Sequence, residues 1–425
     1  MKNYQVSIER NGVQIPVGAI VGESHKDARF AYDLSYLSEA DAVPVSISLP
    51  LQSEPFSAER TKAFFDGLLP EGFTRQSVAQ WMHLDAGDYL SVLCGLGREC
   101  LGALQITDGL ENVSASYERI TEDQVRKLAA EGAAKSAELV AKAHLSLTGA
   151  SGKVGLYFNE PENMWYLPKG TAPSTHIVKQ SHVRLNGIVA NEQLSLLTAA
   201  ECGIDIPQSF IINTGSGRDG EVLLATRRYD RVFDGRKRIG ALPCPMRLHQ
   251  EDFAQAMGVA AAKKYERRGE AYLRKMFQIL RAHSADPMTD TLKLWDAVIF
   301  DYLIGNTDAH IKNFSLLYSS DMKEKRLAPI YDIVSTVIYE SSTRDMAFSI
   351  GDIYSIDEIG EESLRKAAAD AGIGRRIAMK RFNALRESFC SALKKSAGKL
   401  VRSGFDSAAL IAAKIVRSGG IAKWI

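Results

Sequence analysis

The chain has 425 residues, of which 45% are apolar and 24% are charged, as in ordinary soluble globular proteins of two or three domains. Its formal net charge of +1 excludes a chain that is itself a strong general nucleic-acid binder, because such binding relies on a large cationic excess. No uncharged apolar run reaches the roughly 18–20 residues that a membrane span needs. The five cysteines form no Cys-x-x-Cys pair and the first residues contain no signal-peptide core, so we expect a cytoplasmic protein with reduced thiols and no membrane contact.

The first part of the chain has the pattern of a compact mixed α/β domain. Gly and Pro separate short stretches in which polar and apolar residues alternate, which is typical of strands joined by turns. The expected elements are strands over residues 4–8 and 45–49 and a helix over residues 57–69. These patterns predict an N-terminal domain of residues 1–107.

An Ala-, Glu- and Lys-rich stretch follows this domain, and its composition favours a helix. Thr121 precedes Gln124 by three residues, which is the spacing of a capping box at a helix start. We therefore predict a helical connector over residues 108–143.

Residues 144–425 are predicted to form a catalytic domain with two lobes. The first lobe, residues 144–231, has the pattern of a small antiparallel sheet that carries one helix. The expected strands cover residues 153–158, 164–167, 176–179, 208–212 and 221–226, and the helix covers 191–201. The second lobe, residues 232–425, reads as mostly helical with one interruption at residues 305–332. This order predicts an α+β fold with a cleft between a small β-rich lobe and a large helical lobe.

The interruption at residues 305–332 has the residue types of a metal-assisted phosphoryl-transfer site. An apolar helical face ends at Gly305, and a polar loop with Asp308 and Asn313 follows directly. If the next two apolar runs pair with 318 opposite 327, Asn313 lies beside Asp332, and two such oxygen ligands suit Mg²⁺ bound together with phosphates. The D-x-x-x-x-N spacing is that of a kinase catalytic loop, with Asp332 where a second metal-binding Asp belongs. The alternative is that these residues only form turns, and Pro329 shortens the pairing.

Two further features are suited to binding phosphates. Lys179 ends a predicted strand, as the strand lysine of kinases does, although a solvated strand-end lysine has the same pattern. The Gly- and Ser-rich loop at residues 146–153 departs from a P-loop, because Leu147 and Val154 replace the required Gly and Ser or Thr. It still suits a flap whose N–H groups face phosphates, or else a flexible linker.

The chain resembles the HipA family of toxin kinases along nearly its whole length. The resemblance is carried by ordered motifs: SISLPL at 46–51, FFDGLLPE at 64–71, GRECLGA at 97–103, NE at 191–192, RYDR at 228–231, HQEDF at 249–253, YLIGNTD at 302–308 and YD at 331–332. It implies an N-terminal domain followed by a kinase-like domain related in architecture to lipid kinases. It also implies the toxin half of a toxin–antitoxin pair.

The resemblance assigns roles to individual residues. Asp308 would be the catalytic base, Asn313 and Asp332 would hold Mg²⁺, and Ser146 would be autophosphorylated. Lys179 is expected on the ATP phosphates, and Arg227, Arg228 and Tyr229 are expected beside adenine. His310 is expected on the γ-phosphate unless it is a plain loop histidine. The flap that would contact ATP consists of Gly149, Ala150, Ser151, Gly152 and Lys153. The expected partners are a helix-turn-helix antitoxin of the HipB type, operator DNA reached through it, and a substrate of the aminoacyl-tRNA synthetase class.

Some residues depart from the family pattern. The flap lacks the Gln and Glu of the common toxin loop, which makes Ser151 a second candidate phosphoacceptor. Arg227 stands where an acidic residue is usual, so nucleotide contacts there are expected to use the backbone. The basic stretch at residues 263–268 is either a DNA contact or a solvated helix face. Two other functions stay open: a small-molecule or lipid kinase of the same architecture, and a silent corepressor that only docks an antitoxin.

Overall fold

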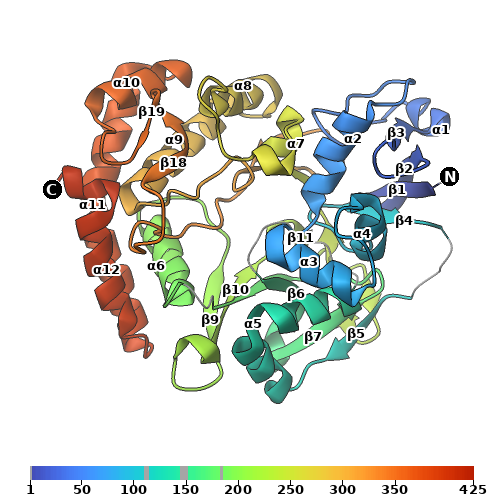
Figure 1. The fold of residues 1–425 in the computed structure, drawn as a ribbon, viewed down its shortest axis with the longest axis horizontal. Helices are drawn as coiled ribbons and strands as arrows, with labels where there is room; N and C mark the ends of the chain where they lie inside the picture. The colour runs from blue at the N-terminus through green and yellow to red at the C-terminus, as the bar shows by residue number, and fades with distance from the viewer. Residues whose placement is uncertain (1, 110–113, 144–151, 182–184) are drawn as a thin grey trace. The chain divides into compact units, whose positions relative to one another are not determined.

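The structure is a computed structural model that describes residues 2–109, 114–143, 152–181 and 185–425 (Figure 1). It divides into two compact units, each assembled from three separate segments of the chain. The first unit contains Met1–His182, Ala225–Ala261 and Leu317–Glu324, and the second contains Val183–Leu224, Ala262–Leu316 and Lys325–Ile425. Among the described residues, no helix has both the length and the apolar character to span a bilayer.

An antiparallel sheet of four strands begins the first unit, in the order β3-β2-β1-β4. Its strands are β1 (Lys2–Arg10), β2 (Val13–Gly22), β3 (Arg29–Tyr32) and β4 (Leu104–Thr107). Val6, Ile8, Ile20 and Phe30 are fully buried, so the alternating pattern of the sequence does mark the core face of these strands. The helices in this region are α1 (Leu34–Leu37), α2 (Ala58–Phe65), the 3-10 turn η1 (Asp66–Leu68), α3 (Gly72–Trp81) and α4 (Tyr89–Leu96).

The predicted strand at residues 45–49 is wrong. This segment forms a tight turn closed by an isolated bridge between Ser46 and Leu49. Glu251 holds it, because its carboxylate accepts hydrogen bonds from the Ser46 hydroxyl at 2.5 Å and from the Ile47 N–H at 3.1 Å. The alternation of polar and apolar residues here reflects a turn whose polar side chains face a buried carboxylate.

A second sheet of the first unit contains β5 (Ser116–Arg119), β7 (Met164–Lys169), β6 (Lys153–Asn159) and β8 (His176–Gln180), adjacent in that order. Helix α5 (Glu122–Ala143) packs on this sheet (Figure 1). The predicted capping box is confirmed: the Thr121 N–H donates to Gln124 Oε1, and the Gln124 N–H donates to Thr121 Oγ1. Further along the chain come β11 (Arg231–Val232), β12 (Arg238–Ile239), β13 (Leu242–Pro243), β14 (Met246–Arg247), β15 (Gln250–Asp252) and α7 (Phe253–Met257).

Helices dominate the second unit. They are α6 (Ile188–Glu201), α8 (Tyr272–His283), α9 (Pro287–Ile304), α10 (Glu361–Asp370), α11 (Arg375–Arg402) and α12 (Ser407–Ser418). The long helix α11 contacts α6, α9, α10 and α12, and α12 also packs against α6 (Figure 1). The strands with residues in this unit are β9 (Ser209–Asn213), β10 (Val222–Arg227), β16 (Ser315–Tyr318), β17 (Lys325–Leu327), β18 (Asp345–Ile350) and β19 (Ile353–Ser355).

The interruption between the helices is longer than predicted. No α-helix lies between the end of α9 and the start of α10 at Glu361, all of which the structure describes, so the expected end at residue 332 is wrong. The hairpin of β18 and β19 lies in the additional non-helical segment between residue 332 and Glu361. The α+β fold class is confirmed.

Helix α9 ends where the sequence predicted. Its C-cap is Gly305 with φ +80°, a left-handed conformation that a residue with a side chain rarely adopts. A Cβ atom at Gly305 would lie 2.3 Å from Val337 Cγ2 and 3.1 Å from Gly419 Cα. The glycine therefore sets both the end of the helix and the direction in which the polar loop leaves it.

Candidate functional site

The polar loop after α9 is fixed by hydrogen bonds at its first two residues. The Asn306 side chain donates to Asp301 Oδ1 at 2.8 Å, and its backbone N–H donates to the Asp301 carbonyl at the same distance. The Thr307 N–H donates to Thr336 Oγ1 at 2.8 Å, and the Thr307 hydroxyl donates to the Thr343 carbonyl at 3.1 Å. The loop is therefore a rigid continuation of the core helix.

Asp308 is the one exposed residue between positions 301 and 316, all of which are described and otherwise buried. Asn313 lies near it, because its side-chain nitrogen donates to the Asp308 carbonyl at 3.1 Å. That bond directs the amide oxygen of Asn313 to the opposite side of its side chain. A rigid loop thus presents one carboxylate to solvent and one oriented amide oxygen.

The predicted pairing of the two strands after this loop is wrong by two residues. The Ala328 N–H donates to the Ser315 carbonyl at 2.9 Å, and the Ser319 N–H donates to the Glu324 carbonyl at 2.9 Å. These bonds put residue 315 opposite 328, so 318 lies opposite 325 and not 327. The Ser319–Glu324 bond closes the turn and sets this register, and Pro329, which has no N–H, ends the pairing before it reaches Asp332.

Asp332 nevertheless lies at the loop, brought there by its neighbour. The Tyr331 hydroxyl donates to the Lys312 carbonyl at 2.9 Å and is hydrogen bonded to the Ser315 hydroxyl at 2.7 Å, which ties this part of the chain to both sides of Asn313. Asp332 has φ +60°, a left-handed conformation that is uncommon for a residue with a side chain and that clusters at functional sites.

Burial and neighbouring charges shift the pKa values of two groups at the loop. Burial, with a smaller contribution from the Asp332 carboxylate, raises the pKa of Asp301 to about 7, although the hydrogen bond from Asn306 lowers it. Burial lowers the pKa of His310 to about 3, and Lys264 and Lys312 act in the same direction, while Asp332 opposes them. His310 is therefore a neutral imidazole at neutral pH.

Tyr265 is a residue of this loop region that the sequence analysis missed. Its hydroxyl donates to Asp308 Oδ1 at 2.6 Å, and its ring stands edge-on to the His310 ring with 5.3 Å between the centroids. The alternative of a solvated helix face at residues 263–268 is wrong, because the 3-10 turn η4 (Ala261–Lys263) ends before Lys264 and no helix follows until α8. A single tyrosine among charged residues was the only sequence signal for it.

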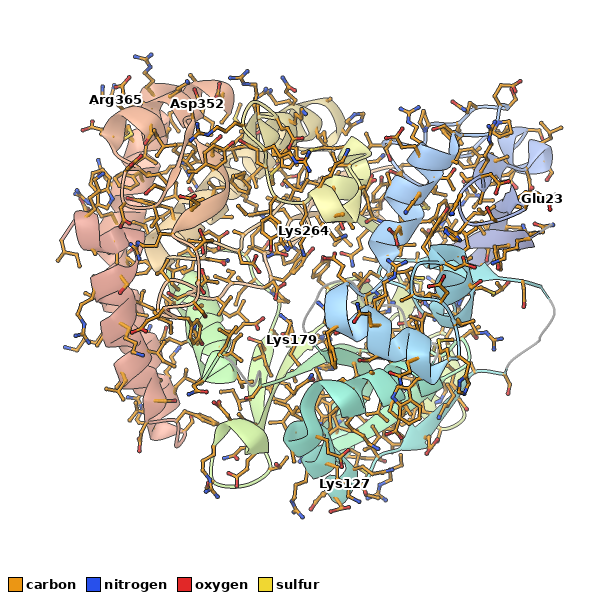
Figure 2. All side chains as sticks on the ribbon, viewed as in Figure 1. Glu23, Lys127, Lys179, Lys264, Asp352 and Arg365 are labelled. Atoms are coloured by element: carbon orange, nitrogen blue, oxygen red, sulfur yellow. The ribbon has the colours of Figure 1, made fainter. Side chains whose placement is uncertain are left out.

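Two lysines that we expected at the phosphates lie opposite each other in the first unit. Lys179 on β8, labelled in Figure 2, is the register partner of Lys153 on β6, so the two side chains leave the same face of the sheet. Both side chains are half-buried. Of the predicted flap, Gly152 is described and buried, whereas Gly149, Ala150, Ser151 and the expected phosphoacceptor Ser146 lie outside the described residues.

The residues expected beside adenine have separate surroundings. The Arg227 guanidinium lies 3.6 Å from Glu160 Oε1, and the Tyr229 hydroxyl donates to the side chain of Gln250. Arg228 is buried, and it donates to Glu99 at 3.1 Å. Its side chain is therefore occupied, and any contact from position 228 to a nucleotide would use the backbone.

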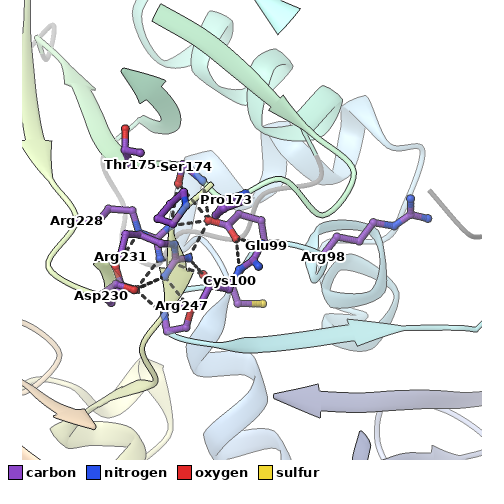
Figure 3. Close-up of polar contacts among 12 residues, drawn as sticks. Arg98, Glu99, Cys100, Pro173, Ser174, Thr175, Arg228, Asp230, Arg231 and Arg247 are labelled. Atoms are coloured by element: carbon purple, nitrogen blue, oxygen red, sulfur yellow. Dashed lines mark hydrogen bonds and ion pairs between the residues drawn. The ribbon is translucent and has the colours of Figure 1, made fainter. Parts of the chain in front are cut away.

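Arg228 belongs to a buried ionic cluster, which consists of Glu9, Glu99, Arg228, Asp230, Arg231 and Arg247. Figure 3 shows Glu99, Asp230 and the three arginines. Glu99 is at its centre and accepts hydrogen bonds from Arg231 at 2.8 Å and from Arg247 at 2.8 Å, in addition to the bond from Arg228. Burial by itself would raise the pKa of Glu99, but the three guanidinium groups hold it at about 2. The cluster joins three distant segments of the first unit.

No group of three or more His, Cys, Asp or Glu residues that could hold a metal ion by itself occurs in the described parts of the chain. The donors at the loop, the amide oxygen of Asn313 and the carboxylate of Asp332, are hard oxygen ligands of the kind that Mg²⁺ uses when phosphates complete its shell. The residues present therefore fit Mg²⁺ bound jointly with a polyphosphate and do not form a closed metal site.

Comparisons with known proteins agree over almost the whole chain. A model of the HipA-like C-terminal domain matches residues 145–397, and a model of the HipA N-terminal domain matches residues 13–107. A candidate kinase of Sinorhizobium fredii, Y4mE, is 34% identical over 393 residues, which cover 89% of each chain. The serine/threonine-protein kinase toxin HipA of Shewanella oneidensis is 25% identical over 382 residues, which cover 84% of this chain and 82% of that protein.

The fold is also that of a solved structure. A chain of the complex of HipA, HipB and operator DNA from Shewanella oneidensis superposes with a TM-score of 0.77 and 19% identity, covering 97% of both chains. The similarity shows a shared fold, an N-terminal domain followed by a kinase-like domain.

Proposed function

The chain belongs to the HipA-like kinase family, and from this premise we propose that it transfers the γ-phosphoryl group of ATP to a serine or threonine hydroxyl. The observation that carries the proposal is the loop after α9. It is rigid and buried except for Asp308, its Asn313 side chain is bonded to the Asp308 carbonyl, and Tyr331, the residue before Asp332, is bonded to the Lys312 carbonyl. Phosphoryl transfer depends mainly on such positioning and on charge neutralisation.

In this proposal Asp308 is the catalytic base. Its exposed carboxylate accepts the proton of the acceptor hydroxyl, whose oxygen forms the new bond to the γ-phosphorus as the bond to the ADP oxygen breaks. The hydrogen bonds of Asn306 and Thr307 fix the backbone that leads into Asp308. His310 contributes a neutral ring near the γ-phosphate and no charge.

Asn313 and Asp332 would hold Mg²⁺ through their oxygens. Bound there with ATP, the ion supplies neutralisation of the charge that develops on the phosphate oxygens. The role of the protein is to keep the two oxygens in place, which Tyr331 does from one side and the Asp308 carbonyl from the other.

Lys179 and Lys153 are the proposed cations for the ATP phosphates. They are register partners on β6 and β8, so two ammonium groups leave one face of the sheet, which suits the several negative charges of a polyphosphate. We assign the adenine contacts to the backbone of 227–229, since the side chains of Arg227, Arg228 and Tyr229 are held by other groups. The loop from Gly149 to Lys153 would close over the phosphates.

The biological role we propose is that of the toxin of a HipBA-like pair. The substrate would be a translation component such as an aminoacyl-tRNA synthetase, and Ser146 would be phosphorylated in an autoinhibitory step. A helix-turn-helix antitoxin would bind the chain and bring it to operator DNA. Family membership supports each of these points.

The test is incubation of the purified chain with γ-labelled ATP and Mg²⁺, alone and with a set of aminoacyl-tRNA synthetases. We expect label on the chain itself and on one synthetase, and loss of the self-label in Ser146→Ala protein. Label on a lipid or metabolite and on no protein would favour a small-molecule kinase instead. Failure of the chain to bind Mg²⁺·ATP would favour a corepressor.

A further inference from the structure

The carboxylate that we propose as the catalytic base has a hydrogen-bond donor of its own. The Tyr265 hydroxyl donates to Asp308 Oδ1 at 2.6 Å, which is short for a bond between two oxygens and typical of a charged acceptor. The bond holds one carboxylate oxygen, so the carboxyl group cannot rotate freely and Oδ2 has a defined direction. Tyr265 is 48% exposed, so core packing alone does not account for its position.

The tyrosine is fixed in this position from three sides. Its ring meets the His310 ring edge-on, and the Lys264 ammonium lies over the ring, 5.5 Å from its centroid. The next residue, Glu266, anchors the segment: its carboxylate accepts from the Ser349 hydroxyl at 2.8 Å and from the Tyr354 hydroxyl at 2.6 Å.

The backbone of the segment is tied as well. The Glu266 N–H donates to the Ala347 carbonyl at 2.8 Å, and the Tyr272 N–H donates to the Glu266 carboxylate at 2.7 Å. The Tyr272 hydroxyl donates to the Lys263 carbonyl at 2.8 Å, which closes the segment on its other side. A short irregular stretch with this many bonds delivers one hydroxyl to one carboxylate.

A base that is itself oriented by a third group is a common arrangement in group-transfer enzymes. Orientation reduces the number of carboxylate conformations and therefore raises the fraction in which an oxygen faces the incoming hydroxyl. We propose that Tyr265 is a positioning residue for Asp308, presented by the Lys264–Tyr265–Glu266 segment. This inference rests on the proposed kinase function and adds a residue to its site.

The first test is steady-state kinetics of Tyr265→Phe protein, which keeps the ring and removes the hydroxyl. General-base catalysis contributes roughly 10²–10⁴-fold to the rate of a reaction, so we expect loss of the orientation of Asp308 to lower kcat about tenfold. The KM for ATP, the KM for the acceptor and the Tm should not change. Tyr166→Phe is the control, because the Tyr166 hydroxyl also donates to a carboxylate, that of Glu162 at 3.3 Å, and kcat should stay at the wild-type value. An unchanged kcat in Tyr265→Phe protein, or a higher one with a lower acceptor KM, would overturn the inference.

The same substitution in an Asp308→Asn background distinguishes positioning from an independent effect. If Tyr265 acts through Asp308, Tyr265→Phe has no further effect on the residual rate of Asp308→Asn protein. An equal tenfold loss of rate on Tyr265→Phe in the wild-type and Asp308→Asn backgrounds would contradict the positioning role. If Asp308→Asn protein is as active as wild type, the proposed function itself is wrong.

A spectroscopic measurement that needs no turnover distinguishes failure of this inference from failure of the proposed kinase function. In protein labelled with 3-fluorotyrosine, the ¹⁹F resonance of Tyr265 is identified by its loss in Tyr265→Phe protein. We expect this resonance to move in Asp308→Asn protein while that of Tyr166 does not. Identical Tyr265 resonances in wild-type and Asp308→Asn protein would show that the hydrogen bond is absent and the inference wrong, whatever the activity.

Discussion

Replacement of Glu99 by glutamine tests the buried ionic cluster of the first unit with almost no change in shape. The wild-type carboxylate accepts hydrogen bonds from three guanidinium groups and from the Ser174 N–H at 3.0 Å. The glutamine removes the negative charge and leaves the arginines with Glu9 and Asp230 as their only carboxylates in the cluster.

The magnitude follows from the pKa of Glu99, which the folded protein holds at about 2 against an ordinary value of 4.5. At roughly 1.4 kcal/mol per unit, the difference corresponds to about 3 kcal/mol of unfolding free energy at neutral pH. Loss of one partner from a buried ion pair costs a similar amount, about 3–5 kcal/mol. Because the pKa is lowered on folding, this stabilisation is present above pH 4.5 and is lost as the pH falls toward 2.

Urea denaturation of wild-type, Glu99→Gln and Glu54→Gln proteins measures the effect. Glu54 is exposed, so its variant should stay within about 0.5 kcal/mol of wild type. We expect Glu99→Gln protein to lose about 3 kcal/mol at pH 7, and the gap to wild type to narrow as the pH falls below 4.5. A loss under about 1 kcal/mol, or a gap that does not change with pH in that range, would refute the reasoning.

Two further predictions concern the ATP phosphates and the end of α9. Lys179→Met and Lys153→Met should each raise the Kd for ATP about tenfold in calorimetry, as expected for loss of a charge-assisted hydrogen bond. The control Lys127→Met, on the exposed face of α5, should bind ATP with the wild-type Kd. Equal ATP affinity in all three variants would show that the lysine pair does not bind the phosphates. Gly305→Ala should destabilise the protein by more than about 2 kcal/mol and abolish phosphoryl transfer. The control Gly203→Ala, with φ +82° and nothing within 4 Å of the new Cβ, should lower the stability by about 1 kcal/mol and leave transfer intact. An equal shift of the Tm in the two variants would contradict the tight packing at Gly305.

The parts of the site that lie close together in the sequence could be predicted from it. The apolar face of α9, its terminal glycine and the polar loop are local patterns, so Asp308 and Asn313 were placed after a rigid element in advance. Asp332 was also identified, although the pairing used to place it was shifted by two residues. The turn between Ser319 and Glu324 sets that register through bonds that no periodicity reveals.

The missed residues depend on contacts between distant segments. Tyr265 precedes Asp308 by 43 positions, and only the folded chain shows that Glu266 and the β18–β19 hairpin hold it there. Asp301 is a buried residue of α9, and burial and the Asp332 carboxylate raise its pKa. The false strand at residues 45–49 has the same cause, since Glu251 supplies the bonds that replace a strand partner. The domain limits at 107, 143 and 231 stay predictions.

The central claim is that Asp308 is the base of an ATP-dependent phosphoryl transfer. The most direct test is the rate of γ-phosphoryl transfer by Asp308→Asn protein at saturating Mg²⁺·ATP, with ATP affinity measured in parallel. We predict a fall in the transfer rate of roughly 100-fold or more, with ATP affinity and Tm close to those of wild type. Transfer at the wild-type rate by Asp308→Asn protein would contradict the account.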